Sequence, residues 1–214
     1  LVKLIKLLAD SDTDIRGNAA TAIANYAEKN ILDIMALVSL IKLLSDEDSF
    51  IRGNAATAIA NYAEKGMVNV KAVEPLIKLL MDENVYSRGN AATAIARYAE
   101  NALLNKKALE RLVALLSDEN EDVRMRVVDA TARYSERGLV NSNALEHLTK
   151  LLDERRMDIR IRAATAIGFY AENGFVNEAA LRPLVEMCRE EDSHVLWAAT
   201  FAIGGYAVKG IISS

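Results

Sequence analysis

The chain has 214 residues, of which 51% are hydrophobic and 26% charged, and its formal net charge at pH 7 is −4. A chain of this length and apolar content can bury a continuous core, which excludes an intrinsically disordered protein. The acidic balance argues against a general nucleic-acid binder, because neutralising phosphates needs a clustered excess of Lys and Arg.

A 36-residue period runs through the chain and is clearest in its tyrosines. Six tyrosines keep this spacing: Tyr26, Tyr62, Tyr98, Tyr134, Tyr170 and Tyr206. Five arginines keep it too: Arg16, Arg52, Arg88, Arg124 and Arg160. A period of roughly 20 to 50 residues is typical of repeat architectures, in which each unit buries its apolar face against its neighbours. We predict one repeat domain over residues 1–214, with repeats at about 1–32, 33–68, 69–104, 105–140, 141–176 and 177–214.

The first helix of each repeat is indicated by apolar residues at helical spacing, in the second full copy Val73, Leu76, Ile77 and Leu80 within the segment 70–81. A residue able to cap a first helical turn precedes it in every copy: Asp33, Asn69, Asn105, Asn141, Asn177 and Ser213. Pro75 and Pro183 lie slightly inside that first turn. We therefore expect a local distortion of the helix in those two copies.

The second helix of each repeat is predicted over residues 51–65 and their equivalents, with a buried stripe at Ala55, Ala58, Ile59, Tyr62 and Ala63. Its predicted caps are Asp12, Asp48, Asn84, Asn120 and Asp192, and Arg156 breaks the series. Its end is predicted at residues suited to the left-handed conformation, with one weak copy at Ala102: Asn30, Gly66, Ala102, Gly138, Gly174 and Gly210. Each repeat is therefore predicted to be a helical hairpin.

The segment AVEPLIKLLMDENVYSRGNAATAIARYAE resembles the last two helices of an armadillo repeat. The 36-residue length and the pairing of Asp46 with Arg52 and Asp82 with Arg88 resemble HEAT repeats. The short link before the next repeat leaves no room for a third helix. This resemblance implies an all-α fold, a right-handed α-solenoid (alpha-alpha superhelix) of six stacked two-helix HEAT/ARM-like repeats. We also expect the chain to be a fragment of a longer array, because Leu1 aligns part-way into a first helix.

Function is expected on the outer face of the second helices, which line the concave side of such solenoids. One column there reads Asn25, Asn61, Arg97, Arg133, Phe169 and Gly205, and the resemblance matches it to the asparagine with which peptide-binding armadillo proteins hold a ligand backbone. A carboxamide both donates and accepts, so it can pair with an extended peptide of any sequence. The predicted binding residues are Asn18, Asn25, Asn54, Asn61, Asn90, Arg97, Arg126, Arg133, Arg162, Phe169, Trp197 and Phe201.

Several alternatives stay open for these residues. The columns can also be a solvated polar face, and the apolar last repeat, with Trp197 and Phe201, can be either a docking patch or a terminal repeat adapted to its neighbour. The tryptophan column of nuclear-import receptors falls on threonines such as Thr21, so binding of nuclear signals is not predicted. The Arg16 column, beside acidic turns, is expected to tie adjacent repeats together.

A scaffold that binds an extended segment of another protein is the function that the sequence favours. The alternatives are an enzyme or enzyme subunit of the HEAT-like lyase or DNA glycosylase type, and a structural solenoid that associates end to end. The two histidines lie in superficial columns, and Cys188 takes the place of core leucines. We therefore expect no catalysis, no cofactor, no metal, no nucleic acid and no membrane, in a cytoplasmic protein, or a nuclear one if the source is eukaryotic.

Overall fold

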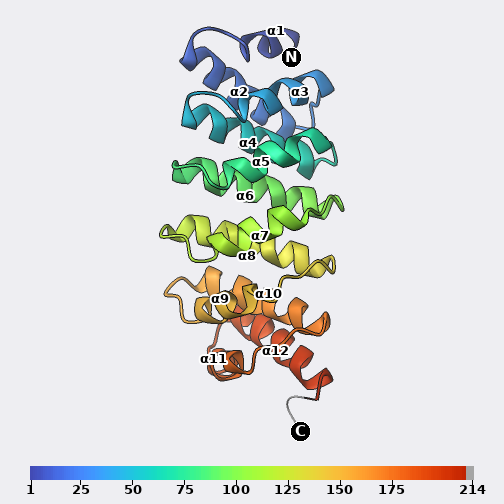
Figure 1. The fold of residues 1–214 in the computed structure, drawn as a ribbon, viewed down its shortest axis with the longest axis vertical. Helices are drawn as coiled ribbons and strands as arrows, with labels where there is room; N and C mark the ends of the chain where they lie inside the picture. Colours follow the sequence, from blue (N-terminus) through green and yellow to red (C-terminus); the bar gives the residue numbers. More distant parts are fainter. Residues whose placement is uncertain (211–214) are drawn as a thin grey trace. The chain divides into compact units, whose positions relative to one another are not determined.

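The computed structural model describes residues 1–210, in which helix follows helix along the whole chain (Figure 1). Its contacts group into two compact units, Leu1–Arg111 (unit 1) and Leu112–Ser214 (unit 2). Unit 1 contains α1 (Val2–Leu7), α2 (Thr13–Glu28), α3 (Ile34–Leu43), α4 (Ser49–Glu64), α5 (Val73–Leu79) and α6 (Val85–Glu100). The helix α7 (Lys106–Leu115) spans the boundary between the units. Unit 2 continues with α8 (Glu121–Glu136), α9 (Ala144–Leu151), α10 (Met157–Glu172), α11 (Leu181–Met187) and α12 (Ser193–Val208).

Each repeat pairs a short first helix, here called an A helix, with a second, 16-residue B helix. In unit 1 the B helices α2, α4 and α6 pack side by side, and α1, α3 and α5 each pack on the B helix of their own repeat. In unit 2 α8, α10 and α12 pack side by side, with α9 on α10 and α11 on α12. The prediction of helical hairpins is confirmed.

The predicted starts of the B helices are confirmed by side-chain hydrogen bonds. The Asp48 carboxylate accepts from the Phe50 and Ile51 N–H groups at 2.8 and 3.2 Å, and Asp12, Asn84, Asn120 and Asp192 cap in the same way. Arg156, which breaks the series of capping residues, makes no side-chain cap hydrogen bond, as predicted. Pro75 and Pro183 lie in α5 and α11, each of which is preceded by a 3₁₀ turn, Val70–Ala72 and Glu178–Ala180. The predicted cap Ser213 lies outside the described residues.

The ends of the B helices take the predicted left-handed backbone. The residue after each C-cap has a positive φ, from 60° at Asn30 and Ala102 to 87° at Gly174. The chain then turns back, and the N–H of the following residue bonds the carbonyl of the repeated tyrosine, as in Leu103 to Tyr98 at 3.0 Å. These bonds satisfy carbonyls that the end of a helix leaves open.

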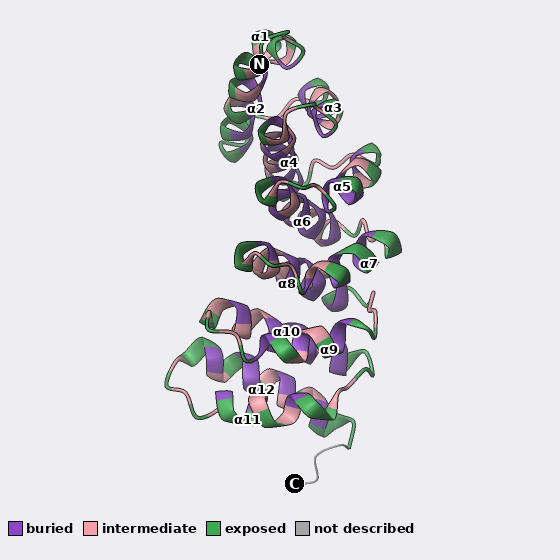
Figure 2. Ribbon diagram, turned by 60° about the vertical axis from the view of Figure 1, so that its left-hand side comes forward, coloured by how far each residue is buried: buried purple, intermediate pink, exposed green. Residues whose placement is uncertain are grey.

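The repeated tyrosines close the hairpins from inside. Tyr62, Tyr98, Tyr134, Tyr170 and Tyr206 are fully buried, whereas Tyr26 is 39% exposed. The Tyr206 hydroxyl donates to the Asn177 carbonyl at 2.8 Å and accepts from the Asn177 N–H at 3.0 Å, which fixes the start of one helix to the end of the next. Burial raises the pKa of Tyr170 to about 12, although a hydrogen bond from the Asn141 backbone opposes the shift. Figure 2 shows the resulting core, with α4 and α6 largely in purple.

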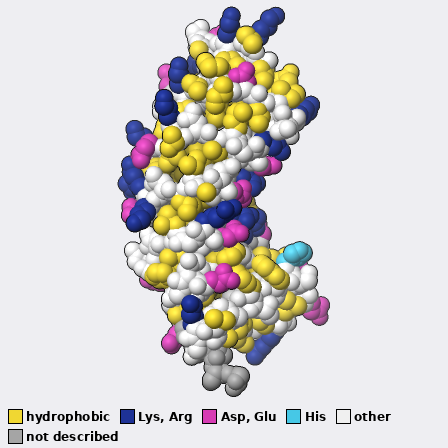
Figure 3. All heavy atoms as spheres, turned by 90° about the vertical axis from the view of Figure 1, so that its right-hand side faces the viewer, with side chains coloured by type: hydrophobic (Ala, Val, Ile, Leu, Met, Phe, Trp, Pro, Cys, Tyr) yellow, Lys and Arg dark blue, Asp and Glu magenta, His cyan; other side chains and the backbone are white. Residues whose placement is uncertain are grey.

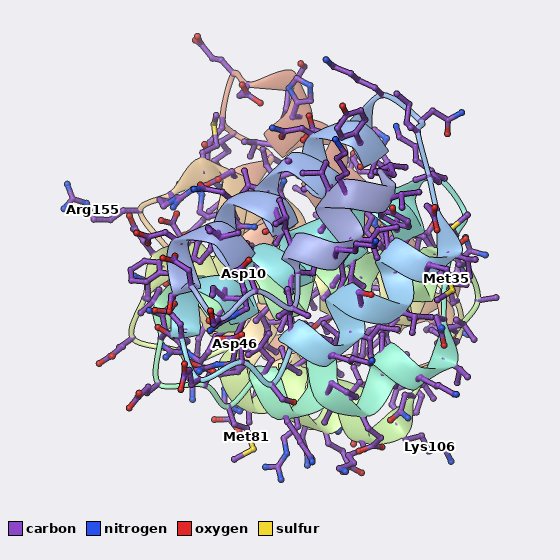
Figure 4. All side chains as sticks on the ribbon, turned by 90° about the horizontal axis from the view of Figure 1, so that it is seen from above. Asp10, Met35, Asp46, Met81, Lys106 and Arg155 are labelled. Atoms are coloured by element: carbon purple, nitrogen blue, oxygen red, sulfur yellow. The ribbon has the colours of Figure 1, made fainter. Side chains whose placement is uncertain are left out.

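The Arg16 column forms the expected ladder between repeats. Arg16 donates to both carboxylate oxygens of Asp46, at 2.9 and 3.0 Å, and its remaining nitrogen bonds the Asp10 and Ser11 carbonyls. Arg52 repeats this arrangement with Asp82, at 2.6 and 3.0 Å. Figure 4 places Asp10 and Asp46, one repeat apart, on the same side of the view and Met35 on the other. In unit 2 the rungs are Arg124 with Glu154 and Arg160 with Glu190.

The ladder carboxylates keep their charge although they are shielded from water. Burial alone raises the pKa of Asp46, but the hydrogen bonds from Arg16 and the Asp48 N–H, with the charges of Arg16 and Arg52, lower it overall. The pKa of Asp82 is lowered in the same way, against burial, by Arg52, the Asn84 N–H and the charge of Arg88. The rungs Arg16–Asp46 and Arg52–Asp82 are therefore ion pairs at neutral pH.

Candidate functional site

The predicted asparagines of unit 1 follow the B helices, but they are not equally accessible. Asn18 and Asn25 on α2 are exposed, and Asn54 and Asn61 on α4 are half-buried. Asn90 on α6 is only 5% exposed, so the expectation that it faces a ligand is wrong. Its Nδ2 donates to the Gly53 carbonyl on α4 at 3.3 Å.

Asn61 has one half of its carboxamide engaged inside the protein. Its Nδ2 donates to the Ala24 carbonyl at 3.2 Å and to Glu28 Oε1 at 3.4 Å, both on the preceding B helix. Only the oxygen of this amide is left to accept a hydrogen bond from a ligand. The side chain therefore ties α4 to α2 in addition to any role in binding.

Two hollows in unit 1 are lined by predicted binding residues. One, of about 280 Å³, lies between the first halves of α2 and α4, and its lining is Thr13, Asp14, Gly17, Asn18, Asp48, Phe50, Ile51 and Asn54. The other, of about 340 Å³, lies at the ends of the same helices and is lined by Glu28, Asn61, Glu64 and Lys65. The structure therefore brings Asn18 and Asn54 together and places Asn61 in a separate hollow.

The predicted arginines are paired with carboxylates. Arg97 donates to Glu100 at 3.0 and 3.1 Å, and its other terminal nitrogen lies 3.7 Å from Glu64. In unit 2 Asp129 lies between Arg133, at 3.9 Å, and Arg162, at 3.7 Å, while Arg126 is half-buried on α8. On the face drawn in Figure 3, basic and acidic side chains likewise lie among one another. Partly exposed pairs of this kind contribute little to stability, but they reduce the positive charge offered to a ligand.

The predicted aromatic residues form one cluster in unit 2. Phe169 on α10 and Phe201 on α12 meet edge to face, with ring centroids 5.2 Å apart, and Trp197 stacks on Phe201 at 5.4 Å with an interplanar angle of 6°. Phe201 lies directly over Gly168, where an added Cβ would meet its ring at 2.4 Å. The outer member, Trp197, is 58% exposed.

A comparison with models of protein families shows the family to which the chain belongs. The model described as the adaptin N-terminal region matches residues 3–199. The chain belongs to this adaptin family. Comparison with curated proteins gave no match.

Solved structures similar to this adaptin-family chain include engineered proteins and designed armadillo repeat proteins. A crystal structure described as an engineered protein has a TM-score of 0.85 at 26% identity and covers 96% of each chain. A designed armadillo repeat protein has a TM-score of 0.82 at 27% identity, covering 95% of this chain and 98% of its own. Another, solved in complex with the peptide (KR)4, has a TM-score of 0.81 at 27% identity and the same coverage. These likenesses confirm a HEAT/armadillo-like α-solenoid of six two-helix repeats.

Two exposed aromatic residues near the predicted site, of which one lines the hollow between the first halves of α2 and α4, were not among the predicted binding residues. Phe50 and Tyr86 occupy one column, at the first turns of α4 and α6, and are 64% and 42% exposed. The signal was present, because the same column otherwise holds aspartate or histidine: Asp14, Asp122, Asp158 and His194. Glu28 and Glu64, which line the second hollow, were also not among the predicted binding residues.

The histidine and cysteine side chains named in the sequence analysis lie at or near the surface of the part of the chain that the structure describes. His147 Nδ1 lies 2.8 Å from Ser117 Oγ at the surface. Cys188 is partly exposed, so the expectation that it lies fully in the core is wrong. Within residues 1–210, no group of three or more His, Cys, Asp or Glu residues is placed to hold a metal ion, and no helix is long and apolar enough to cross a membrane.

Proposed function

We propose that the chain is a non-catalytic scaffold that binds an extended segment of another protein along the outer faces of its B helices. The observation that carries this proposal is the position of Asn18, Asn54 and Asn61 in the hollows over α2 and α4. The engineered neighbour in complex with a peptide supports the same use of this fold. A cytoplasmic location and the absence of nucleic-acid, membrane and cofactor binding belong to the same proposal.

Recognition in unit 1 rests on amide hydrogen bonding more than on net charge. The α2 amides Asn18 and Asn25 are exposed, and a carboxamide can pair with both the N–H and the C=O of a peptide. B helices pack about 8 to 10 Å apart, and an extended chain advances about 3.3 Å per residue. One asparagine per repeat therefore meets such a peptide every two or three residues. Arg97 contributes less, because Glu100 and Glu64 already neutralise it.

The test uses the exposed amides of α2, because replacing Asn61 would also remove the hydrogen bonds from its side chain to α2. Peptides selected from a random displayed library are titrated by fluorescence anisotropy against the chain and against an Asn18→Ala, Asn25→Ala double variant. Losing two hydrogen bonds of about 1 kcal/mol each lowers affinity by at least tenfold. Thermal stability should change by less than about 0.5 kcal/mol, as for most surface changes.

The matched control is Asn143→Ala, which removes an exposed asparagine from the start of α9, where its side chain makes no cap hydrogen bond. This variant should bind the selected peptides as the unaltered chain does. Equal affinity of the double variant and the control would refute the asparagine site. The enzyme alternative has no observation in the structure that favours it, and end-to-end association through the Trp197 surface remains a proposal.

A further inference from the structure

The interface between α4 and α6 is closed by an aromatic ring. Tyr86, from the first turn of α6, lies over Gly53 of α4, so close that a Cβ at position 53 would meet the ring at 2.4 and 2.6 Å. The Tyr86 hydroxyl donates to Asn54 Oδ1 at 3.1 Å. This interface therefore contains a complete receptor for a phenol ring: a glycine floor and an amide acceptor one residue later.

The interface between α2 and α4 has the same parts but lacks the ring. Gly17 and Asn18 are the equivalents of Gly53 and Asn54, one repeat earlier. A Cβ at position 17 would come no nearer than 3.7 Å to Ile51 and 3.9 Å to Asn54. The equivalent of Tyr86 is Phe50, which is 64% exposed and does not come within 4 Å of that Cβ position.

The two rings differ in their ability to hydrogen-bond the asparagine beside the glycine. The Tyr86 hydroxyl bonds Asn54, whereas phenylalanine at position 50 has no group that can bond Asn18. The space over Gly17 is open and forms part of the hollow of about 280 Å³. A cavity of about 150 Å³ can hold a benzene molecule, so this hollow has room for one phenol ring.

We propose that the hollow over Gly17 binds the side chain of a tyrosine from the partner segment, with its ring over Gly17 and its hydroxyl on Asn18, the two contacts that Tyr86 makes with Gly53 and Asn54. This inference rests on the proposed function and names one residue type that the partner supplies. The ring contacts Gly17, Ile51 and Phe50, and the phenol hydroxyl donates to Asn18 Oδ1. Asp14 and Asp48 in the lining disfavour a phosphorylated tyrosine, because the carboxylates repel a phosphate.

The probe for this site is p-cresol, which is the tyrosine side chain alone, added to the isotope-labelled chain and followed by NMR. We expect saturable shifts of the Gly17, Asn18 and Asn54 amide signals. Toluene, which lacks the hydroxyl, should bind about fivefold more weakly, because one hydrogen bond of about 1 kcal/mol is missing. The phosphate monoester of p-cresol should give no saturable shift at these residues.

Two variants separate ring binding from effects on folding. Gly17→Ala should keep or raise the melting temperature, because the added methyl has room and alanine favours a helix more than glycine does. It should weaken p-cresol binding at least tenfold, because a ring lying as close to position 17 as Tyr86 lies to Gly53 would overlap that methyl. Phe50→Tyr should also weaken binding, since it supplies the missing hydroxyl from within the chain and lets residue 50 fill the hollow.

Asn18→Ala isolates the hydrogen bond. It should lower the affinity for p-cresol to that for toluene and leave toluene binding unchanged. Absence of saturable shifts at Gly17, or equal p-cresol affinity in the chain and the Gly17→Ala variant, would overturn the tyrosine site. Neither result depends on a peptide, so the scaffold proposal is judged separately by the titrations of the Asn18, Asn25 double variant.

Discussion

The two units of the chain use one repeat pattern for different outer surfaces. In unit 1 the outward positions of α2 and α4 carry Asn18, Asn25, Asn54 and Asn61, and hollows lie between the helices. In unit 2 the same columns carry Arg126, Arg133, Arg162 and Phe169; Arg133 and Arg162 lie beside Asp129, and Phe169 packs into the aromatic cluster. The inner columns of alanine and tyrosine barely change. The buried periodicity therefore specifies the fold, whereas the outward columns differ between the two units.

The units also differ in how deeply their ladders are buried. The rung Arg52–Asp82 of unit 1 has side chains 16% and 8% exposed, whereas Arg160–Glu190 of unit 2 has 18% and 37%. Aspartate brings the carboxylate close to the turn, where it also accepts a backbone bond, as Asp82 does from Asn84 at 2.9 Å. Glutamate in unit 2 reaches the arginine from a longer and more exposed side chain.

Truncating one rung in each unit gives the largest effect that we expect. Asp82→Ala leaves the Arg52 guanidinium without its carboxylate in a shielded place and should lower the free energy of unfolding by about 3 kcal/mol. Glu190→Ala should lower it by about 1 kcal/mol or less, because water can solvate the exposed end of Arg160. Chemical denaturation followed by circular dichroism measures both. Equal losses would show that rung burial does not distinguish the units.

The second-largest effect that we expect is a loss of stability in acid, through the arginine–aspartate ladder of unit 1. The pKa values of Asp46 and Asp82 are lower in the folded chain than the ordinary value of 3.8. Such groups stabilise the fold fully above the unfolded pKa, and the contribution is lost as pH falls through the folded pKa. The denaturation midpoint should hold from pH 7 to about 4 and fall below that value. In Asp82→Ala this fall should be shallower, and an unchanged slope would contradict the assignment.

The fold could be predicted from the sequence because its signals are local and repeated. Capping residues such as Asp48, the turn residues after each B helix and the buried tyrosines depend on helix chemistry that is the same in every copy. The two expected exceptions are also confirmed. Arg156 makes no cap hydrogen bond, and a 3₁₀ turn precedes the helix that contains Pro75. Arg97 and Glu100 lie three residues apart on α6, a spacing at which helical side chains meet, and the structure pairs them.

The candidate site was less predictable because it depends on distances between helices. Asn90 and Asn61 occupy outward columns, yet both donate to backbone carbonyls of the preceding B helix. The structure places the Tyr86 ring over Gly53 but leaves a hollow open over Gly17, although both repeats carry a glycine and an aromatic residue at the equivalent positions. These features become visible only when the coordinates are known.

The smallest expected effect compares the ends of two B helices, one in each unit. Ala102 and Gly174 both have left-handed backbones, with φ of 60° and 87°. A Cβ at position 174 would meet no atom within 4 Å, so only the backbone decides the outcome there. Alanine in this conformation costs about 1 kcal/mol relative to glycine, and part of that is offset by the greater freedom of glycine in the unfolded chain.

Ala102→Gly in unit 1 should therefore raise the free energy of unfolding by about 0.5 to 1 kcal/mol, and Gly174→Ala in unit 2 should lower it by about the same amount. Asn30→Gly serves as the control, because asparagine tolerates this conformation and only a few tenths of a kcal/mol are expected. Urea denaturation of the three variants, combined with the double change Ala102→Gly, Gly174→Ala, tests the comparison directly. If the opposing changes fail to cancel in the double variant, the two helix ends are not equivalent, and the strain at Ala102 is relieved by contacts that Gly174 lacks.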